Sequence, residues 1–101
     1  MEIVHLDERR YWKWLDKLDR TRRGAVMRRI DSLRQYGLEI GMPTIRRLFG
    51  GVWEVRSPLG ERMYFTVIDG VAVFVAYGNK DTQLRDTVVA QRRAAEARDA
   101  H

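Results

Sequence analysis

RMYFTVIDGVAVFVAY, residues 62–77, is the stretch that decides the fold of this 101-residue chain. Its first part, up to residue 68, is strand-like, and Asp69-Gly70 is a two-residue turn of the kind that joins antiparallel strands. Residues 71–77 are almost all apolar, which is typical of a central strand covered on both faces. The stretch therefore predicts a β-hairpin near the middle of a sheet.

Two further segments read as strands. Residues 52–56 (VWEVR) alternate in character, with Trp53 and Val55 in one phase and Arg56 in the other. Residues 2–6 (EIVHL) form a short candidate strand at the start of the chain. We expect the segment at 52–56 and the hairpin to make a three-stranded antiparallel meander.

Helical periodicity lies between these strand segments. Asp7 is a candidate N-cap for a helix that runs to about Asp19, and a second helix is expected over roughly residues 20–36, with Gly37 as its C-terminal stop. The inward positions of the two helices, at three- and four-residue spacing, are Tyr11, Trp14, Leu15 and Leu18, then Val26, Ile30 and Leu33. The spacing indicates core packing and a helical hairpin.

The chain becomes polar and alanine-rich from about Thr82, which predicts a terminal helix with few anchors, chiefly Val88 and Val89. The fold class that follows is α+β, a small twisted antiparallel sheet with an N-terminal helical hairpin on one face and a C-terminal helix. Packing of the helices on one face would leave the opposite face for function. No linker is visible, so we expect one domain.

Composition narrows the classes of function. The chain has no cysteine and two separate histidines, His5 and His101, which excludes a disulfide framework or a thiolate metal site and makes a histidine metal set a poor prospect. We expect no cofactor. No run of about 18 apolar residues could span a bilayer, and no secretion signal is visible, so we expect a cytoplasmic protein.

The positive charge lies mainly in the first half of the chain. The net charge is +5 and the pI is near 10.1, which favours an anionic partner such as nucleic acid. On the second predicted helix, Arg22 and Arg23 belong to a basic polar face. That face is either solvated or a docking surface for nucleic acid or an acidic partner.

A family resemblance is carried by LFGG, WEVR, GERMYF, the Asp-Gly turn, VAVFVAYGNKD and TQLRD, in this order. The series resembles the RelE/ParE superfamily of bacterial toxins, most closely the HigB-like, phage-related branch of addiction-module killer proteins. The resemblance covers essentially residues 1–101 and implies the α+β fold just described. It also implies a cognate antitoxin, by analogy with this branch a helix-turn-helix DNA-binding protein.

The resemblance leaves two activities open. Many members are ribosome-dependent endoribonucleases that cut messenger RNA, whereas ParE relatives poison DNA gyrase, and fold alone does not choose between them. A gyrase-inhibiting or otherwise protein-binding toxin without nuclease activity is therefore the alternative to an mRNA interferase. A nucleic-acid-binding module without toxicity is a third possibility.

The same resemblance assigns site residues by position. The family's basic groups fall on Arg46 and Arg47, the arginine of its LR pair on Arg56, the arginine that opens its next strand on Arg62, and its last basic residue on Lys80. On this reading Arg56, Arg62 and Lys80 form the catalytic set. Arg46, Arg47, Arg22, Arg23 and Tyr64 would bind RNA.

The chemistry explains why arginines suit such a site. In metal-free RNA cleavage the 2′-hydroxyl attacks the adjacent phosphorus, so the enzyme must hold these atoms in line and stabilise charge on the phosphoryl oxygens. Arginine does both but is a poor general base. Lys80, Glu54, Asp81 and Tyr77 are the titratable candidates, and the base stays unassigned, because relatives often place a tyrosine or histidine where this chain has DTQLRD.

Strand parity supports convergence of the arginines independently of the family. If Trp53 and Val55 face the helices, Arg56 points to the other side of the sheet. Arg62 and Tyr64 share a phase on the next strand, and the connection at residues 57–61 allows a register that places them beside Arg56. Arginines that flank turns are also commonly only solvated. Among the remaining residues, Trp12 is either a base-stacking residue or a packing residue, Asn79 is a turn residue, and Gly50-Gly51 reads as a bulge or turn.

Overall fold

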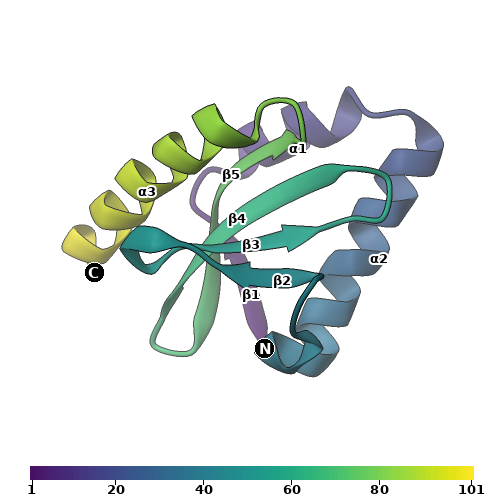
Figure 1. Cartoon of the computed structure of the whole chain (residues 1–101). Helices are drawn as coiled ribbons and strands as arrows, with labels where there is room; N and C mark the ends of the chain where they lie inside the picture. The colour runs from purple at the N-terminus through teal and green to yellow at the C-terminus, as the bar shows by residue number, and fades with distance from the viewer.

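A computed structural model describes residues 1–101 as a five-stranded sheet with three α-helices (Figure 1). The elements in chain order are β1 (Glu2–His5), α1 (Glu8–Asp16), α2 (Arg20–Tyr36), the 3-10 turn η1 (Gly37–Ile40), β2 (Ile45–Arg47), the 3-10 turn η2 (Phe49–Gly51), β3 (Trp53–Arg56), β4 (Glu61–Ile68), β5 (Val71–Asn79) and α3 (Gln83–Ala100). The predicted α+β class is confirmed.

The sheet has the order β1-β5-β4-β3-β2. The hairpin of β4 and β5 is confirmed, and both turn residues, Asp69 and Gly70, have positive φ (49° and 78°), as a tight turn between twisted strands requires. Antiparallel pairing holds from β2 to β5. The first strand departs from the expected antiparallel sheet, because β1 lies parallel to β5 and makes the sheet mixed.

The helix boundaries are close to those predicted, except that α1 ends at Asp16 before the expected Asp19, which instead caps α2. The side chain of Asp7 accepts from the backbone N–H of Arg10, and that of Asp19 accepts from the N–H of Arg22 at 2.8 Å. At the end of α2, Gly37 has a φ of 61°, a conformation that glycine adopts without strain. The helical hairpin therefore begins and ends on the residues that the sequence singles out.

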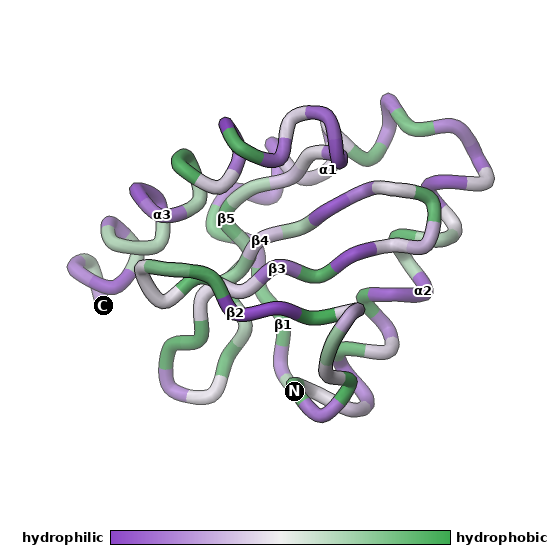
Figure 2. Tube along the Cα trace, viewed as in Figure 1, coloured by the Kyte–Doolittle hydropathy of each residue, from purple (hydrophilic) through white to green (hydrophobic).

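Two apolar layers lie on the two faces of the sheet. The helical hairpin packs on one face through Tyr11, Leu15, Val26, Ile30 and Leu33, which meet Val55, Met63, Phe65 and Phe74 of the strands. The other cluster joins Val52, Tyr64, Val73, Val75 and Ala76 of the opposite face to Ala90 and Ala94 of α3. Most of β5 is hydrophobic and is covered on both sides, as predicted for a central strand (Figure 2).

The position of α3 corrects one expectation. The helices do not share one face, because α3 covers part of the face opposite the hairpin. Its contacts are also not those expected, since Val88 is 62% exposed while Ala90, Ala94 and Ala97 are buried. Alanine has no side chain beyond Cβ, so a row of alanines allows the helix to lie close to the strands.

Candidate functional site

A row of cations crosses four adjacent strands at one end of the sheet. Arg46 lies on β2, Arg56 on β3 and Arg62 on β4, and Lys80 follows the last residue of β5. Arg46 is the register partner of Glu54, and Arg56 is the partner of Arg62. Because side chains alternate along a strand, these three arginines point to the same face, the one that carries α3. The predicted proximity of Arg56 and Arg62 is present in the structure.

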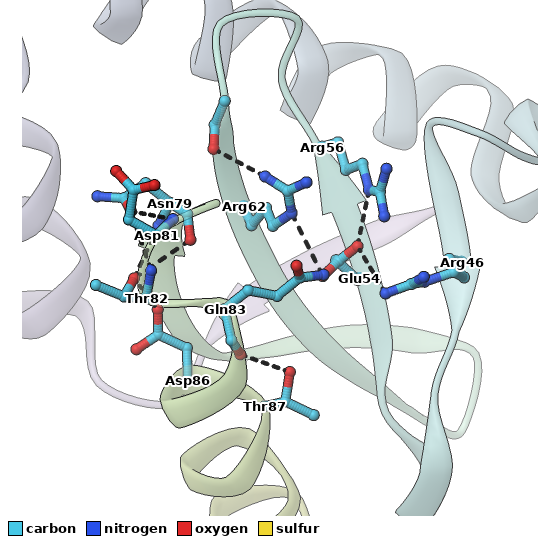
Figure 3. Close-up of polar contacts among 11 residues, drawn as sticks. Arg46, Glu54, Arg56, Arg62, Asn79, Asp81, Thr82, Gln83, Asp86 and Thr87 are labelled. Carbon is cyan, nitrogen blue, oxygen red and sulfur yellow. Dashed lines mark hydrogen bonds and ion pairs between the residues drawn. The ribbon is translucent and has the colours of Figure 1, made fainter.

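The three arginines surround one carboxylate, that of Glu54 (Figure 3). Arg56 Nε donates to Glu54 Oε1 at 2.9 Å, Arg62 Nε lies 3.6 Å from Oε2, and Arg46 Nη2 lies 3.7 Å from Oε1. Gln83, at the start of α3, adds a hydrogen bond from Nε2 to Oε2 at 2.7 Å. Glu54 is fully buried, and its carboxylate holds the arginines through these ion pairs.

The arginines converge, but the anion between them is the chain's own Glu54 carboxylate and not the predicted phosphate. Three guanidinium groups against one carboxylate leave an excess of two positive charges. Of the three arginines, only Arg56 donates a hydrogen bond to Glu54, from its Nε. The Nε atoms of Arg46 and Arg62 are buried and have no hydrogen-bond partner. These buried Nε atoms are closed to solvent, so it is the excess positive charge of the cluster that favours a second anion.

Lys80 stands at the end of this row, beside Arg62. The carbonyl oxygen of Gly60 accepts from Lys80 N at 3.0 Å and from Arg62 Nη1 at 3.1 Å. The side chain of Lys80 is exposed and lines a hollow of about 300 Å³ with Arg22, whose Nε lies 3.4 Å from Glu61 Oε2. Two of the predicted residues, Lys80 and Arg22, are therefore neighbours of the arginine cluster and lie outside it.

Three predicted RNA-binding residues are directed away from the cluster or buried beside it. The guanidinium of Arg47 sits 5.7 Å from the ring centroid of Trp53, on the hairpin side, because it alternates with Arg46 along β2. Arg23 donates from Nη2 to the carbonyl of Leu18 at 3.1 Å and thus ties α2 to the end of α1. Tyr64 has no exposed surface because α3 covers it, which excludes contact with RNA in this conformation.

The candidate bases are also separated by the fold. Tyr77 belongs to the hairpin face, where its hydroxyl lies 2.6 Å from His5 Nδ1, and burial raises its pKa above the ordinary value. Burial, together with the charge of Glu54, likewise raises the pKa of Tyr64, so its phenol stays protonated. Asp81 is exposed on the loop after β5. None of these groups is a free base within the arginine cluster.

The junction between β5 and α3 fixes Gln83 against Glu54 (Figure 3). Asn79 Oδ1 accepts from the backbone N–H groups of Asp81 and Thr82, at 2.8 and 3.2 Å, which confirms Asn79 as a turn residue. Thr82 Oγ1 then donates to Asp86 Oδ2 at 2.5 Å. The roles of Glu54 and Gln83 as the centre of the cluster were missed from sequence, where no local signal marks them.

Comparison with known proteins decides the family. A model of the phage-derived protein Gp49-like family (DUF891) matches residues 13–99. The chain belongs to this family. Gp49-like proteins are known as toxins of addiction modules in the RelE/HigB-like group, so the predicted toxin–antitoxin context is confirmed at this level. No curated protein matches the sequence.

Membership of the Gp49-like family implies an antitoxin partner. No helix of the chain is both long enough and apolar enough to pass through a bilayer. The matched residues include all three arginines around Glu54 and the whole meander. The cluster is therefore part of the family's own domain.

Proposed function

We propose that this Gp49-like toxin is an endoribonuclease that cuts messenger RNA on the ribosome. The observation that carries the proposal is the gathering of Arg46, Arg56 and Arg62 around buried Glu54, with an excess of two positive charges. A phosphodiester carries one negative charge, and the arginine fork binds two of its oxygens at once. The cluster suits an RNA backbone in charge and in donor geometry.

The reaction needs little from the protein beyond position and charge. The 2′-oxygen forms a bond to phosphorus, the bond from phosphorus to the 5′-oxygen breaks, and the hydroxyl proton is balanced by protonation of the leaving 5′-oxygen. The products are a 2′,3′-cyclic phosphate and a 5′-hydroxyl. In this scheme Arg56 and Arg62 stabilise the charge on the phosphoryl oxygens, and Arg46 and Lys80 hold the flanking backbone.

Glu54 acts in this scheme as a positioning residue. It is fully buried, and its two oxygens already accept from Arg56 and Gln83. A carboxylate in this setting holds guanidinium groups in place and has no path to a ribose hydroxyl. Because the cluster has charge but no free base, it depends on a substrate held in line by another surface, and a message fixed on the ribosome meets this need.

A ribosomal target would also give a role to the basic side chains of α2. Arg22 is exposed there and adjoins Lys80 across the hollow at the end of the row. Arg29, seven residues further on, lies on the same side and donates from Nε to the carbonyl of Arg56 at 2.8 Å. We assign this side to contacts with ribosomal RNA, which are sequence-independent and sensitive to salt. A helix-turn-helix DNA-binding protein would be the antitoxin, and it would neutralise the toxin by covering the cluster.

The test is inducible expression with mapping of new RNA 5′ ends, for the wild type, Arg62→Ala and Arg9→Ala. Arg9 is an exposed arginine of α1 without an ion pair, so its variant removes the same charge away from the cluster. We expect growth arrest with cuts inside translated codons for the wild type and Arg9→Ala. Arg62→Ala should restore growth while the purified protein keeps its helical circular dichroism.

Two results would contradict the nuclease proposal. Arrest that persists in folded Arg62→Ala would separate toxicity from the cluster. Arrest without RNA cuts but with DNA damage would favour the protein-binding alternative, a toxin directed at gyrase. The complete pairing of Glu54 is the feature that this alternative would explain, as a structural ion cluster.

A further inference from the structure

Phe49 is the most exposed of the large apolar side chains, with 89% of its surface accessible. It lies on the turn η2, next to β2 at the edge of the sheet. An exposed phenylalanine contributes little to the core of the protein, and a single one needs no explanation by itself. Its setting is what distinguishes Phe49.

The turn that carries Phe49 is held in place from several sides. Leu48 N donates to Val52 O at 2.8 Å, and Gln91 Nε2 of α3 donates to the carbonyl of Phe49 at 3.2 Å. Thr66 Oγ1 donates to Gly51 O at 2.8 Å. Gly50 and Gly51 both have positive φ, at 71° and 70°, which bulkier residues rarely adopt. The backbone is thus fixed while the ring points to solvent.

The surroundings of the ring are cationic. Arg46, Arg47, Leu48 and Phe49 line an open hollow of about 490 Å³. Arg46 belongs to the cluster around Glu54, and three residues of chain reach at most about 11 Å, so the ring lies within reach of the nucleotide next to a phosphate bound there. An aromatic face beside arginines is the combination that binds unpaired bases, by stacking and by charge.

We propose that Phe49 is a base-stacking platform for the nucleotide that flanks the phosphate bound at the arginine cluster, a role that rests on the proposed function. The unpaired base lies on the ring, and Arg46 contacts the adjoining phosphate. The other aromatic candidate, Trp12, is half-exposed on α1 and packs edge-on against Tyr11, on the hairpin side of the sheet. Phe49 is the exposed aromatic that the fold places beside the arginines.

The proposal is tested with single-stranded RNA hexamers whose 2′-hydroxyls are methylated, so that they bind without being cut. Affinity is measured by fluorescence anisotropy at low salt for the wild type, Phe49→Ala, Phe49→Trp and Phe49→Leu. A matched set of hexamers lacks one base at each position in turn. Melting temperature checks the fold, and it should not change, because the ring is exposed.

We expect Phe49→Ala and Phe49→Leu to weaken binding at least about fivefold and Phe49→Trp to keep it. One base-free hexamer should bind the wild type as weakly as the intact hexamer binds Phe49→Ala, and the two losses should not add. The slope of affinity against salt should not change, because Phe49 carries no charge and binds no phosphate.

Equal affinities of the wild type and Phe49→Ala would overturn the stacking role, and Phe49→Leu that binds as tightly as the wild type would do the same. If Arg56→Ala still weakens binding in the same assay, the proposed function stands without Phe49. A wild-type protein that binds no hexamer removes the stacking role, whereas the ribosome-dependent nuclease is judged separately by the mapped RNA cuts. Phe49→Ala that binds RNA normally but escapes its antitoxin would assign the surface to that protein.

Discussion

Glu54 and Arg56 lie two residues apart on β3 with their side chains on the same face, and Arg56 Nε donates to Glu54 Oε1 at 2.9 Å. The carboxylate has no exposed surface, whereas 32% of the arginine side chain is exposed. The pair therefore joins a buried negative centre to a cation at the surface. Arg46 repeats the relationship from β2 with 39% of its side chain exposed, whereas Arg62 on β4 is only 12% exposed.

Removal of the charge at this centre should destabilise the protein. Glu54→Gln leaves three guanidinium groups together without an anion, and loss of one partner of a buried ion pair costs about 3 to 5 kcal/mol. We expect the lower end of this range, because Arg46 and Arg56 keep partial contact with water. Chemical denaturation measures the change in the free energy of unfolding.

Inorganic phosphate should compensate for this destabilisation. It can enter between the arginines of Glu54→Gln, so the melting temperature of the variant should rise more than that of the wild type, relative to chloride at equal ionic strength. Glu39→Gln, at an exposed carboxylate without an ion pair, is the control and should behave as the wild type does. Equal increases in all three proteins would contradict binding of phosphate in the place of the Glu54 carboxylate.

A substitution at Arg56 should change the salt dependence of RNA binding. For single-stranded nucleic acid, each phosphate that a protein cation neutralises adds about 0.7 to the slope of log affinity against log salt. Arg56→Ala should therefore have a slope smaller by about this amount, and Arg9→Ala should keep the wild-type slope, in titrations between about 50 and 200 mM salt. An unchanged slope in Arg56→Ala would place the phosphate elsewhere.

Two glycines should respond to alanine in opposite directions. A Cβ at Gly78 would collide with the carboxylate of Asp86 and come within 2.7 Å of Thr82 Oγ1, so Gly78→Ala should destabilise the protein by about 1 to 3 kcal/mol and disturb the start of α3. Gly24 lies inside α2, where the nearest atom is the mobile end of Arg28 at 3.2 Å. Gly24→Ala should therefore stabilise the protein by up to about 1 kcal/mol. Thermal unfolding measures both changes.

The stability of the protein should fall in mild acid because of His5. Burial, with a smaller effect of Arg34, lowers the pKa of His5 from 6.5 to about 4. Between these values the unfolded chain binds a proton that the folded chain does not, so the free energy of unfolding decreases as pH falls from 6.5 to 4. His5→Gln should show a shallower decrease over this interval. Equal slopes in the two proteins would contradict the assignment.

Much of the site was predictable because local rules apply to it. Asp69-Gly70 fixes the hairpin, and strand parity directs Arg56 away from Trp53 and Val55. A register that places Arg62 beside Arg56 is compatible with the connection between the strands, and the structure has this pairing. Asp7 and Gly37 likewise mark the start and the end of the helical hairpin. These features depend on residues that are close together in the chain.

The remainder depends on contacts between distant segments. Glu54 reads as an ordinary polar strand residue until β2, β4 and α3 bring Arg46, Arg62 and Gln83 to it. The burial of Tyr64 has the same origin, since alanine gives a weak signal for a helix that packs on the second face of the sheet. Tyr77, one of the candidate bases, lies on the hairpin face because side chains alternate along β5.

The parallel pairing of β1 with β5 joins the first strand of the chain to its last. A chain that emerges from its N-terminus has no partner for residues 2–5 until the hairpin of β4 and β5 has also emerged, and β5 is the strand that completes the core under the helical hairpin. The sheet of a nascent chain consequently stays open at β1 during most of its synthesis. The order of synthesis thus delays closure of the sheet until residues 71–79 are available to pair with β1.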